Sequence, residues 1–326
     1  MFLKSYSGTK RFSPLEISEL LETVTQVNKT LEKEQVHVRP KDATGEPGGL
    51  VELFKDLPTF IIPDLHGRSD FILRFLDFQF QGERITTLLG EGKIQVVCLG
   101  DGIHVEYKVS SRWREAFEEY REEYKESPAM DQEIRESFSA ISLIWELKNR
   151  FPDHFHFLKG NHENITNENS NGNHSFIKFA MEGDMTRSYV LRFFGKDFLH
   201  KYSRFEKSLP ILAKGRYFVA SHAQPRSFYD KASIINYRSN PQVIEGLTWT
   251  QNGASPNGTV KQMMTDLLGS ATDSNWWISG HRPINRLYRI WPDEQFIQIH
   301  NPAKYVVALF DVEKNFTPET SVFELI

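Results

Sequence analysis

The sequence predicts an α/β fold of two packed β-sheets flanked by helices. Short apolar runs bounded by Gly or Pro recur along its 326 residues, and such runs are typical of buried strands. Longer segments between them show the spacing of apolar side chains expected for helices. In addition, five of the apolar runs end directly in residues that bind metal ions. Open α/β sheets build their sites in the loops beyond the strand ends, so we expect these residues on one rim.

Each of the five runs leads into Asp, Asn or His. The pairs are residues 60–63 before Asp64 and His66, 96–99 before Asp101, 155–159 before Asn161, 217–221 before His222, and 276–279 before His281. Oxygen and imidazole ligands in one set suit Mn, Fe or Zn. The sequence therefore predicts a site for such metals where the strands end.

The first 49 residues precede this pattern, and we expect them to form an N-terminal helical extension to a single domain over residues 50–326. Ser13-Pro14-Leu15-Glu16 is a capping box with Pro at the first helical position. The apolar residues that follow suggest a docking face; they are Leu15, Ile17, Leu20, Leu21, Val24 and Val27. Residues 40–49 are rich in Gly, Pro and charge and are predicted to be a loop.

Composition argues against several classes of protein. The net charge of −4 does not suggest a nucleic-acid partner. No stretch approaches the ~20 apolar residues that a membrane span needs, and the start of the chain has no hydrophobic segment of signal length. The one cysteine, Cys98, cannot form an internal disulfide, which fits a reducing compartment. We therefore expect a soluble cytoplasmic protein without nucleic-acid or membrane partners.

In chain order the motifs read D-L-H-G, G-D, G-N-H-E, S-H-A and G-H-R. This series resembles the calcineurin-like metallophosphoesterases and, within them, the phosphoprotein phosphatase branch. Gly246-Leu247-Thr248-Trp249 and the late Asn301-Pro302-Ala303-Lys304-Tyr305 also have counterparts there. Any one block is weak alone, but five in order, each after an apolar run, are specific. The resemblance spans roughly Leu50 to the C-terminus and implies a four-layer α/β/β/α sandwich.

The resemblance also implies a centre of two divalent or trivalent metal ions. Asp101 would bridge them, and the ligands of the individual ions would be Asp64 and His66 for the first and Asn161, His222 and His281 for the second. A bridging carboxylate is physically reasonable, because two cations ~4 Å apart repel strongly unless an anionic oxygen lies between them.

By the same resemblance the chain would hydrolyse phosphomonoesters of phosphoproteins or small molecules. A metal-activated hydroxide would attack phosphorus, and His162 would be the general acid that protonates the leaving oxygen. Two other functions remain open. One is hydrolysis of nucleotides or dinucleoside polyphosphates. The other is a catalytically quiet pseudophosphatase, against which the complete ligand set and His162 argue.

The sequence departs from the phosphatase pattern after Asp101. His104 takes the place of the Asp that orients the general acid, and Val105 takes the place of a phosphate-binding Arg; Glu106 could supply the carboxylate instead. A second Arg of the family, expected between Trp249 and His281, is also missing. Losing two guanidinium groups removes bidentate phosphate contacts. The candidate substitutes, which could equally be surface residues, are Arg282, Arg226 and Arg68.

Residues 102–140 include a helical insert of about thirty residues relative to that branch. An aromatic stripe at helical spacing consists of Trp113, Phe117, Tyr120 and Tyr124, and the opposite face is charged. Ser127-Pro128 ends this helix, and a second is predicted from near Met130 to Arg150. The insert is either a hairpin packed on the body or a lid or partner-docking surface. Other histidines lack a motif and are expected to be structural: His37, His154, His156, His174, His200 and His300.

Overall fold

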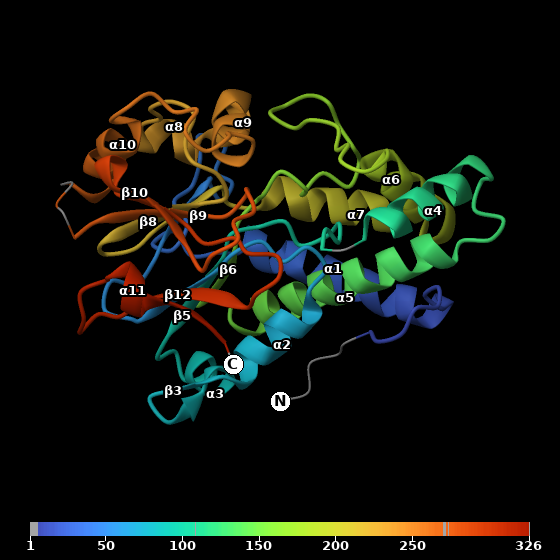
Figure 1. The fold of residues 1–326 in the computed structure, drawn as a ribbon, viewed down its shortest axis with the longest axis horizontal. Helices are drawn as coiled ribbons and strands as arrows, with labels where there is room; N and C mark the ends of the chain where they lie inside the picture. The colour runs from blue at the N-terminus through green and yellow to red at the C-terminus, as the bar shows by residue number, and fades with distance from the viewer. Residues whose placement is uncertain (1–5, 108, 270–271, 273, 326) are drawn as a thin grey trace.

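Two mixed β-sheets pack face to face at the centre of the fold (Figure 1). The computed structural model describes residues 6–107, 109–269, 272 and 274–325. The six-stranded sheet has the order β1-β7-β8-β9-β11-β10. Its strands are β1 (Leu50–Glu52), β7 (Leu212–Lys214), β8 (Phe218–Ser221), β9 (Trp276–Ser279), β11 (Phe296–Gln298) and β10 (Arg289–Trp291).

The second sheet is five-stranded, with the order β13-β12-β2-β5-β6. Its strands are β13 (Val322–Glu324), β12 (Val306–Phe310), β2 (Thr59–Ile62), β5 (Gln95–Cys98) and β6 (Phe155–Phe157). Successive side chains of a strand point to opposite faces. Ile61 and Val97 therefore join the apolar core between the sheets, whereas Phe60 and Val96 join the core beneath the helices.

Helices cover the outer face of each sheet. Those packed against the five-stranded sheet include α1 (Pro14–Glu32), α2 (Ser69–Asp77), α5 (Pro128–Arg150) and α7 (Gly195–Ser208). Those packed against the six-stranded sheet are α8 (Lys231–Ile235), α9 (Pro241–Thr248) and α10 (Thr259–Leu268). The arrangement confirms the predicted four-layer α/β/β/α sandwich.

Shorter elements connect these layers. They are the hairpin of β3 (Gln79–Phe80) and β4 (Glu83–Arg84), helices α3 (Ile85–Gly90), α4 (Ser110–Arg121), α6 (Glu182–Phe193) and α11 (Pro318–Ser321), and the 3-10 turns η1 (Tyr237–Ser239) and η2 (Pro292–Glu294). In the described part of the chain, none of the helices has the length and apolar character that crossing a membrane requires.

Helix α1 begins at the predicted capping box, where Ser13 Oγ accepts from the Glu16 amide and the Glu16 carboxylate accepts from the Ser13 amide. The helix packs along α5 and α7 and buries Leu20, Val24 and Val27. Leu15, which the sequence placed on the docking face, is 71% exposed. Its side chain faces solvent, whereas the adjacent Glu16 pairs with Arg135 of α5 at 2.7 Å.

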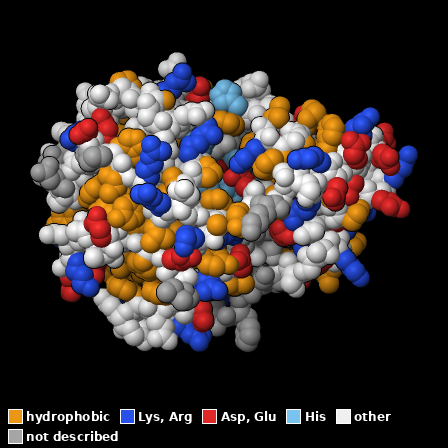
Figure 2. All heavy atoms as spheres, viewed as in Figure 1, with side chains coloured by type: hydrophobic (Ala, Val, Ile, Leu, Met, Phe, Trp, Pro, Cys, Tyr) orange, Lys and Arg blue, Asp and Glu red, His pale blue; other side chains and the backbone are white. Residues whose placement is uncertain are grey.

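The insert packs its aromatic stripe on the body, as the first of its two interpretations expects. Trp113 and Tyr124 are buried, and the Tyr124 hydroxyl donates to the Met185 carbonyl of α6 at 2.7 Å. The second helix, α5, begins at Pro128, slightly earlier than expected. Figure 2 shows charged side chains of both signs over the end of the molecule formed by α4 and the start of α5.

The direction of the strands brings the motif residues together. In the five-stranded sheet β2, β5 and β6 are parallel neighbours, and in the six-stranded sheet β8, β9 and β11 are parallel neighbours. Parallel strands place their carboxyl ends at the same edge. The loops that follow these six strands therefore meet along one rim of the sandwich.

Candidate metal centre

Four residues at the rim have left-handed backbone conformations. They are non-glycine residues with positive φ angles, namely His66 (45°), Asp101 (52°), His104 (66°) and His281 (66°). Such conformations cost of the order of 1–3 kcal/mol each and persist only where the surroundings enforce them. The loops that carry the motif residues are therefore held in specific conformations by their surroundings.

Two glycines let the backbone approach the acidic side chains closely. A Cβ atom at Gly280 would lie 1.8 Å from Asp64 Oδ1, and one at Gly160 would lie 2.1 Å from Asp101 Oδ1. Both distances are far shorter than any non-bonded contact. The Gly in the G-H-R and G-N-H-E motifs is therefore required because a side chain at that position would collide with a carboxylate.

The first group of predicted ligands lies around Asp64 and His66. The His66 Nε2 atom is 3.9 Å from Asp64 Oδ2 and 3.6 Å from Asp101 Oδ2. Its Nδ1 atom donates to the His104 carbonyl at 2.9 Å, which leaves Nε2 as the nitrogen that faces the carboxylates. The backbone amide of His281 donates to Asp64 at 2.8 Å and so links the rims of the two sheets.

The second group lies around His222. Its Nε2 atom is 3.4 Å from Asp101 Oδ2, 2.9 Å from Asn161 Oδ1 and 3.2 Å from His281 Nδ1. Asn161 Oδ1 is also 2.9 Å from His281 Nδ1. The Nδ1 atom of His222 donates to the Leu99 carbonyl, which directs Nε2 inward. Asp101 Oδ2 thus lies between the two groups, where a bridging ligand would be.

Burial and charge in this cluster suit metal ions. Burial raises the pKa of Asp64 well above its usual range. The backbone hydrogen bond from His281 opposes this rise, and the nearby carboxylate of Glu106 adds to it. Burial and the carboxylates of Glu163 and Asp64 raise the pKa of Asp101 likewise. Burial lowers the pKa of His66, and lowers that of His222 to about 3. Neutral imidazole is the metal-binding form, and buried carboxylates are stabilised by a cation.

Unpartnered polar atoms point to the same conclusion. Among the described residues, both ring nitrogens of His300 are buried without a hydrogen-bond partner. Buried polar groups in folded proteins are nearly always satisfied, so two such nitrogens on one ring at this rim call for a ligand. Carboxylate, amide and imidazole donors fit ions such as Mn, Fe or Zn.

The loop after Asp101 is held from several sides. The Glu163 carboxylate accepts from the amides of Asp101 and Gly102 at 2.8 Å and from that of Gly160 at 2.7 Å. These bonds tie the G-D loop to the G-N-H-E loop. Because Glu163 is buried and accepts three amides, we assign it the support of Asp101 rather than a ligand role.

Helix α5 and the insert support the following residues of that loop. The His104 amide donates to Ser137 Oγ at 3.0 Å, and the Val105 amide donates to Glu133 at 2.9 Å. Arg112 of α4, expected on a solvated face, instead pairs with Glu133 at 2.6 Å and is nearly buried. The charged face of α4 is thus partly used to hold the site loop in place.

His162 and His104 are in direct contact. Their Nδ1 atoms are 3.0 Å apart, and His104 Nε2 is 3.2 Å from Thr186 Oγ1 of α6. Phe176 stacks on His104 with ring centroids 4.8 Å apart, and its centroid lies 3.7 Å from that of His162. Burial, reinforced by His66, lowers the pKa of His104 to about 3; burial, His66 and His104 lower the pKa of His162 well below its usual range.

Glu106 is the carboxylate nearest to these imidazoles. It lies 3.6 Å from His66 Nε2 and 3.9 Å from His162 Nε2, and Lys178 pairs with it at 2.5 Å. Burial raises the pKa of Glu106, but His66 and Lys178 outweigh that effect, so the pKa is lowered. Lys178 lies between the G-N-H-E motif and α6, and no motif in the sequence indicated that it would reach the site.

The three arginine candidates differ in position. Arg68 donates to the carbonyls of Asn301 and Lys304 and stacks on Tyr305, which holds it within the body. Arg226 pairs with Glu245 at 2.9 Å and is 63% exposed. Burial, His222 and Arg282 together lower the pKa of His281, and Arg68 contributes, after burial, His66 and His222, to the lowered pKa of His300.

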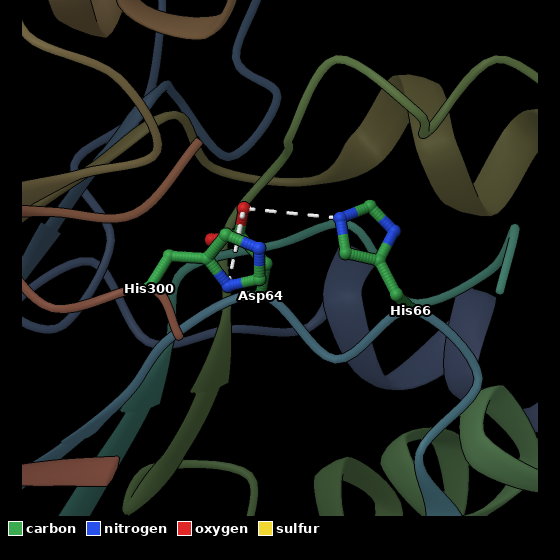
Figure 3. A group of neighbouring side chains, drawn as sticks. All are labelled: Asp64, His66 and His300. Atoms are coloured by element: carbon green, nitrogen blue, oxygen red, sulfur yellow. Dashed lines mark ion pairs between the residues drawn. The ribbon is translucent and has the colours of Figure 1, made fainter. Parts of the chain in front are cut away.

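His300 is the main residue of the site that the motif search did not find. It joins Asp64 and His66 in one group whose potential ligand atoms all lie within 4.8 Å of one another (Figure 3). A signal was present, because the apolar run Phe296-Ile297-Gln298-Ile299 leads into His300 as the other runs lead into their ligands.

No protein-family model matches the sequence, and no curated protein matches it. Among solved structures, the chain is similar to a protein serine/threonine phosphatase from Saccharomyces cerevisiae that resembles human phosphatase PP5. The TM-score is 0.58 at 12% identity, over 94% of this chain and 88% of that one. It is also similar to the cold-active protein-tyrosine phosphatase of a psychrophilic Shewanella species, with a TM-score of 0.50 at 13% identity, over 85% and 82% of the two chains.

Identities this low establish the fold and not the activity. The order of the motifs, the two sheets they join and these similarities agree with one another. The chain therefore has the fold of the calcineurin-like metallophosphoesterases, as its motifs indicated.

Proposed function

We propose that this protein is a dinuclear metal-dependent phosphoesterase that hydrolyses phosphomonoesters. The observation that carries the proposal is the position of Asp101. Its Oδ2 atom lies 3.6 Å from His66, 3.4 Å from His222 and 3.8 Å from His162. One carboxylate oxygen thus stands between two groups of ligand atoms and beside a candidate acid, which is the arrangement that phosphoryl transfer at a metal pair requires.

We assign the predicted ligands to two metal ions. Asp64 and His66 would hold the first, Asp101 would bridge, and the ligands of the second would be Asn161, His222 and His281. Two cations held there would lower the pKa of a bound water and neutralise charge on a phosphoryl group. The neutral amide of Asn161 limits the excess negative charge that a third carboxylate would add. Mn, Fe and Zn fit this donor set.

His162 would donate a proton to the leaving oxygen from Nε2. That atom faces Asp101 and Glu106, whereas Nδ1 is occupied by His104. If His104 Nε2 donates to Thr186, then His104 Nδ1 carries no hydrogen and accepts from His162 Nδ1–H. His162 Nε2, on the side of the metal ligands, would then take up a proton and pass it to the leaving oxygen, which returns the ring to its neutral form. His104 is a positioning residue that sets this tautomer.

Lys178 and Arg282 would replace the missing phosphate-binding arginines. Lys178 is anchored by Glu106 beside the candidate acid. Arg282 follows the ligand His281, and its Nε atom is buried without a hydrogen-bond partner among the described residues. One ammonium and one guanidinium make fewer planar, bidentate contacts to a phosphate group than two arginines do. We therefore expect this site to favour phosphoproteins over small phosphomonoesters less strongly than a site with two arginines would.

A panel of substrates tests the reaction class. The metal-loaded protein would be given p-nitrophenyl phosphate, a phosphoserine peptide, a phosphotyrosine peptide and a dinucleoside tetraphosphate, with released phosphate and nucleotide measured. We expect turnover of the monoesters that the chelator EDTA abolishes. Turnover of the dinucleoside polyphosphate alone would favour the nucleotide hydrolase, and no turnover with two metals bound would favour a pseudophosphatase.

A further inference from the structure

His300 lies at the rim of the metal centre although it belongs to none of the motifs. It follows β11 of the six-stranded sheet as His281 follows the parallel neighbour β9. Its carbonyl accepts from the Ile284 amide at 2.9 Å, which fixes the backbone. The side chain is buried, at 1% exposure, so its ring nitrogens are shielded from bulk solvent.

The imidazole of His300 lacks the hydrogen bonds that a buried ring is expected to form. Neither Nδ1 nor Nε2 forms a hydrogen bond with any described residue. A buried structural histidine normally satisfies at least one nitrogen, as His156 does with the Asp153 carbonyl at 3.2 Å. His66 and His222 at this rim also satisfy one nitrogen each, by a bond to a carbonyl, and turn the other inward, so His300 differs from them in having neither nitrogen bonded.

The geometry places His300 next to the first pair of ligands. Its Nδ1 atom is 3.9 Å from Asp64 Oδ2, and the same oxygen is 3.9 Å from His66 Nε2. Figure 3 shows the two imidazoles on either side of Asp64, each joined to a carboxylate oxygen by a dashed line. With metal–ligand bonds of about 2.1 Å, two ligand atoms of one ion lie roughly 3–4 Å apart. Both distances to Asp64 fall in this range and all three ligand atoms lie within 4.8 Å of one another, so small side-chain movements would let one ion reach all three.

We propose that His300 is a ligand of the first metal ion, together with Asp64, His66 and the bridging Asp101. The proposal rests on the metal centre of the proposed function and adds a residue to it. Each ion would then have two imidazoles. A second imidazole shifts the preference of the first site from Mn towards Zn and Fe, because nitrogen ligands favour the later metals.

The direct test is metal binding rather than turnover. Wild type, His300→Gln and the control His154→Gln would be titrated with Co²⁺, following visible absorbance and the number of ions bound by elemental analysis. His154 is a half-buried histidine stacked on Phe54, away from the rim. We expect His300→Gln to bind one ion at least ~10-fold more weakly and to change its spectrum, while the second ion and the control are unaffected.

Equal affinities and spectra in wild type and His300→Gln would overturn the proposal and leave the proposed function standing. If wild type bound two ions but did not hydrolyse p-nitrophenyl phosphate, the proposed function would be wrong, while the assignment of His300 as a ligand would stand. Should the variant fail to fold, a crystal structure of Co²⁺-loaded wild type decides the question. An anomalous peak within about 2.3 Å of a His300 nitrogen supports it, and a peak more than 3 Å away overturns it.

Discussion

The Nδ1 atoms of His104 and His162 lie 3.0 Å apart. Two imidazoles at this distance share one hydrogen, and two adjacent imidazolium ions would repel. Burial lowers the pKa of both rings, with His66 as a further cause. We therefore expect a neutral pair, in which His104 sets the tautomer of His162 without supplying charge.

His104→Asp should preserve or raise the activity on simple phosphomonoesters, because a carboxylate both accepts from His162 Nδ1 and stabilises its protonated form. His104→Ala should lower kcat by ~10–100-fold, since it leaves the acid without its partner. Glu106→Gln should have a smaller effect than His104→Ala. The pH–rate profiles of the three variants would be measured with p-nitrophenyl phosphate. Wild-type kinetics in His104→Ala would remove its positioning role.

His162→Ala should keep two bound metals but lose its proton donor. We expect kcat on an alkyl phosphate to fall by about 10²–10⁴-fold. The loss on p-nitrophenyl phosphate should be much smaller, because its leaving group needs little protonation. The comparison is the ratio of the two kcat values in wild type and variant, with metal content measured on the same samples. An equal loss on both esters would show that His162 is not the acid.

Lys178→Ala should raise KM for phosphate esters by ~10-fold with a smaller change in kcat, because the ammonium contacts charge that substrate and transition state share. Arg282→Ala should act in the same direction. Arg226→Ala should change KM little, since its side chain is 63% exposed and paired with Glu245. If only Arg226→Ala raised KM, the assignment of the phosphate-binding cations would be reversed.

Glu34→Gln should destabilise the fold by about 3–5 kcal/mol at pH 7, because it leaves two buried cations unpaired. Glu34 pairs with Arg39 and Lys148, each at 2.6 Å, and joins the end of α1 to α5. Burial raises its pKa, but Lys148 and Arg39 outweigh this and lower it to about 2.

Since the folded pKa of Glu34 lies below the unfolded value of about 4.3, its contribution is present above pH ~4.3 and is lost as the pH falls towards 2. Urea unfolding of wild type and variant at pH 7 and pH 3 measures this, and the difference should shrink at pH 3. The control is Glu32→Gln on the exposed side of α1, which should cost under ~1 kcal/mol. A Glu34→Gln variant as stable as wild type would show that the buried network is dispensable.

The sequence was sufficient for the fold and for the placement of the motif residues because both depend on local patterns. Apolar runs identify strands, and parallel strands share an edge, so Asp64, Asp101 and His222 meet without any distance being known. The capping box at Ser13 is likewise a four-residue signal that the structure reproduces.

Contacts between distant segments could not be predicted in this way. Lys178 reaches Glu106 across 72 residues of chain, and Phe176 covers His162 from a loop without periodicity. His300 follows an apolar run as the ligands do, but it lies outside the five motifs, and the motifs alone therefore predict a structural role for it. Arg112 supports the site loop by pairing with Glu133 of the next helix. The charged face of its own helix does not reveal this partner.

The most direct test of the account is the number of metal ions bound to wild type and to Asp101→Asn, measured by elemental analysis after dialysis, alongside hydrolysis of p-nitrophenyl phosphate. Asp101 Oδ2 lies between the two ligand groups, so its charge would stabilise both of the proposed ions. We expect two ions per wild-type chain with EDTA-sensitive turnover, and in Asp101→Asn weaker binding of both ions and loss of most activity. Two ions and near-wild-type turnover in Asp101→Asn, or no metal in an active wild type, would contradict the account.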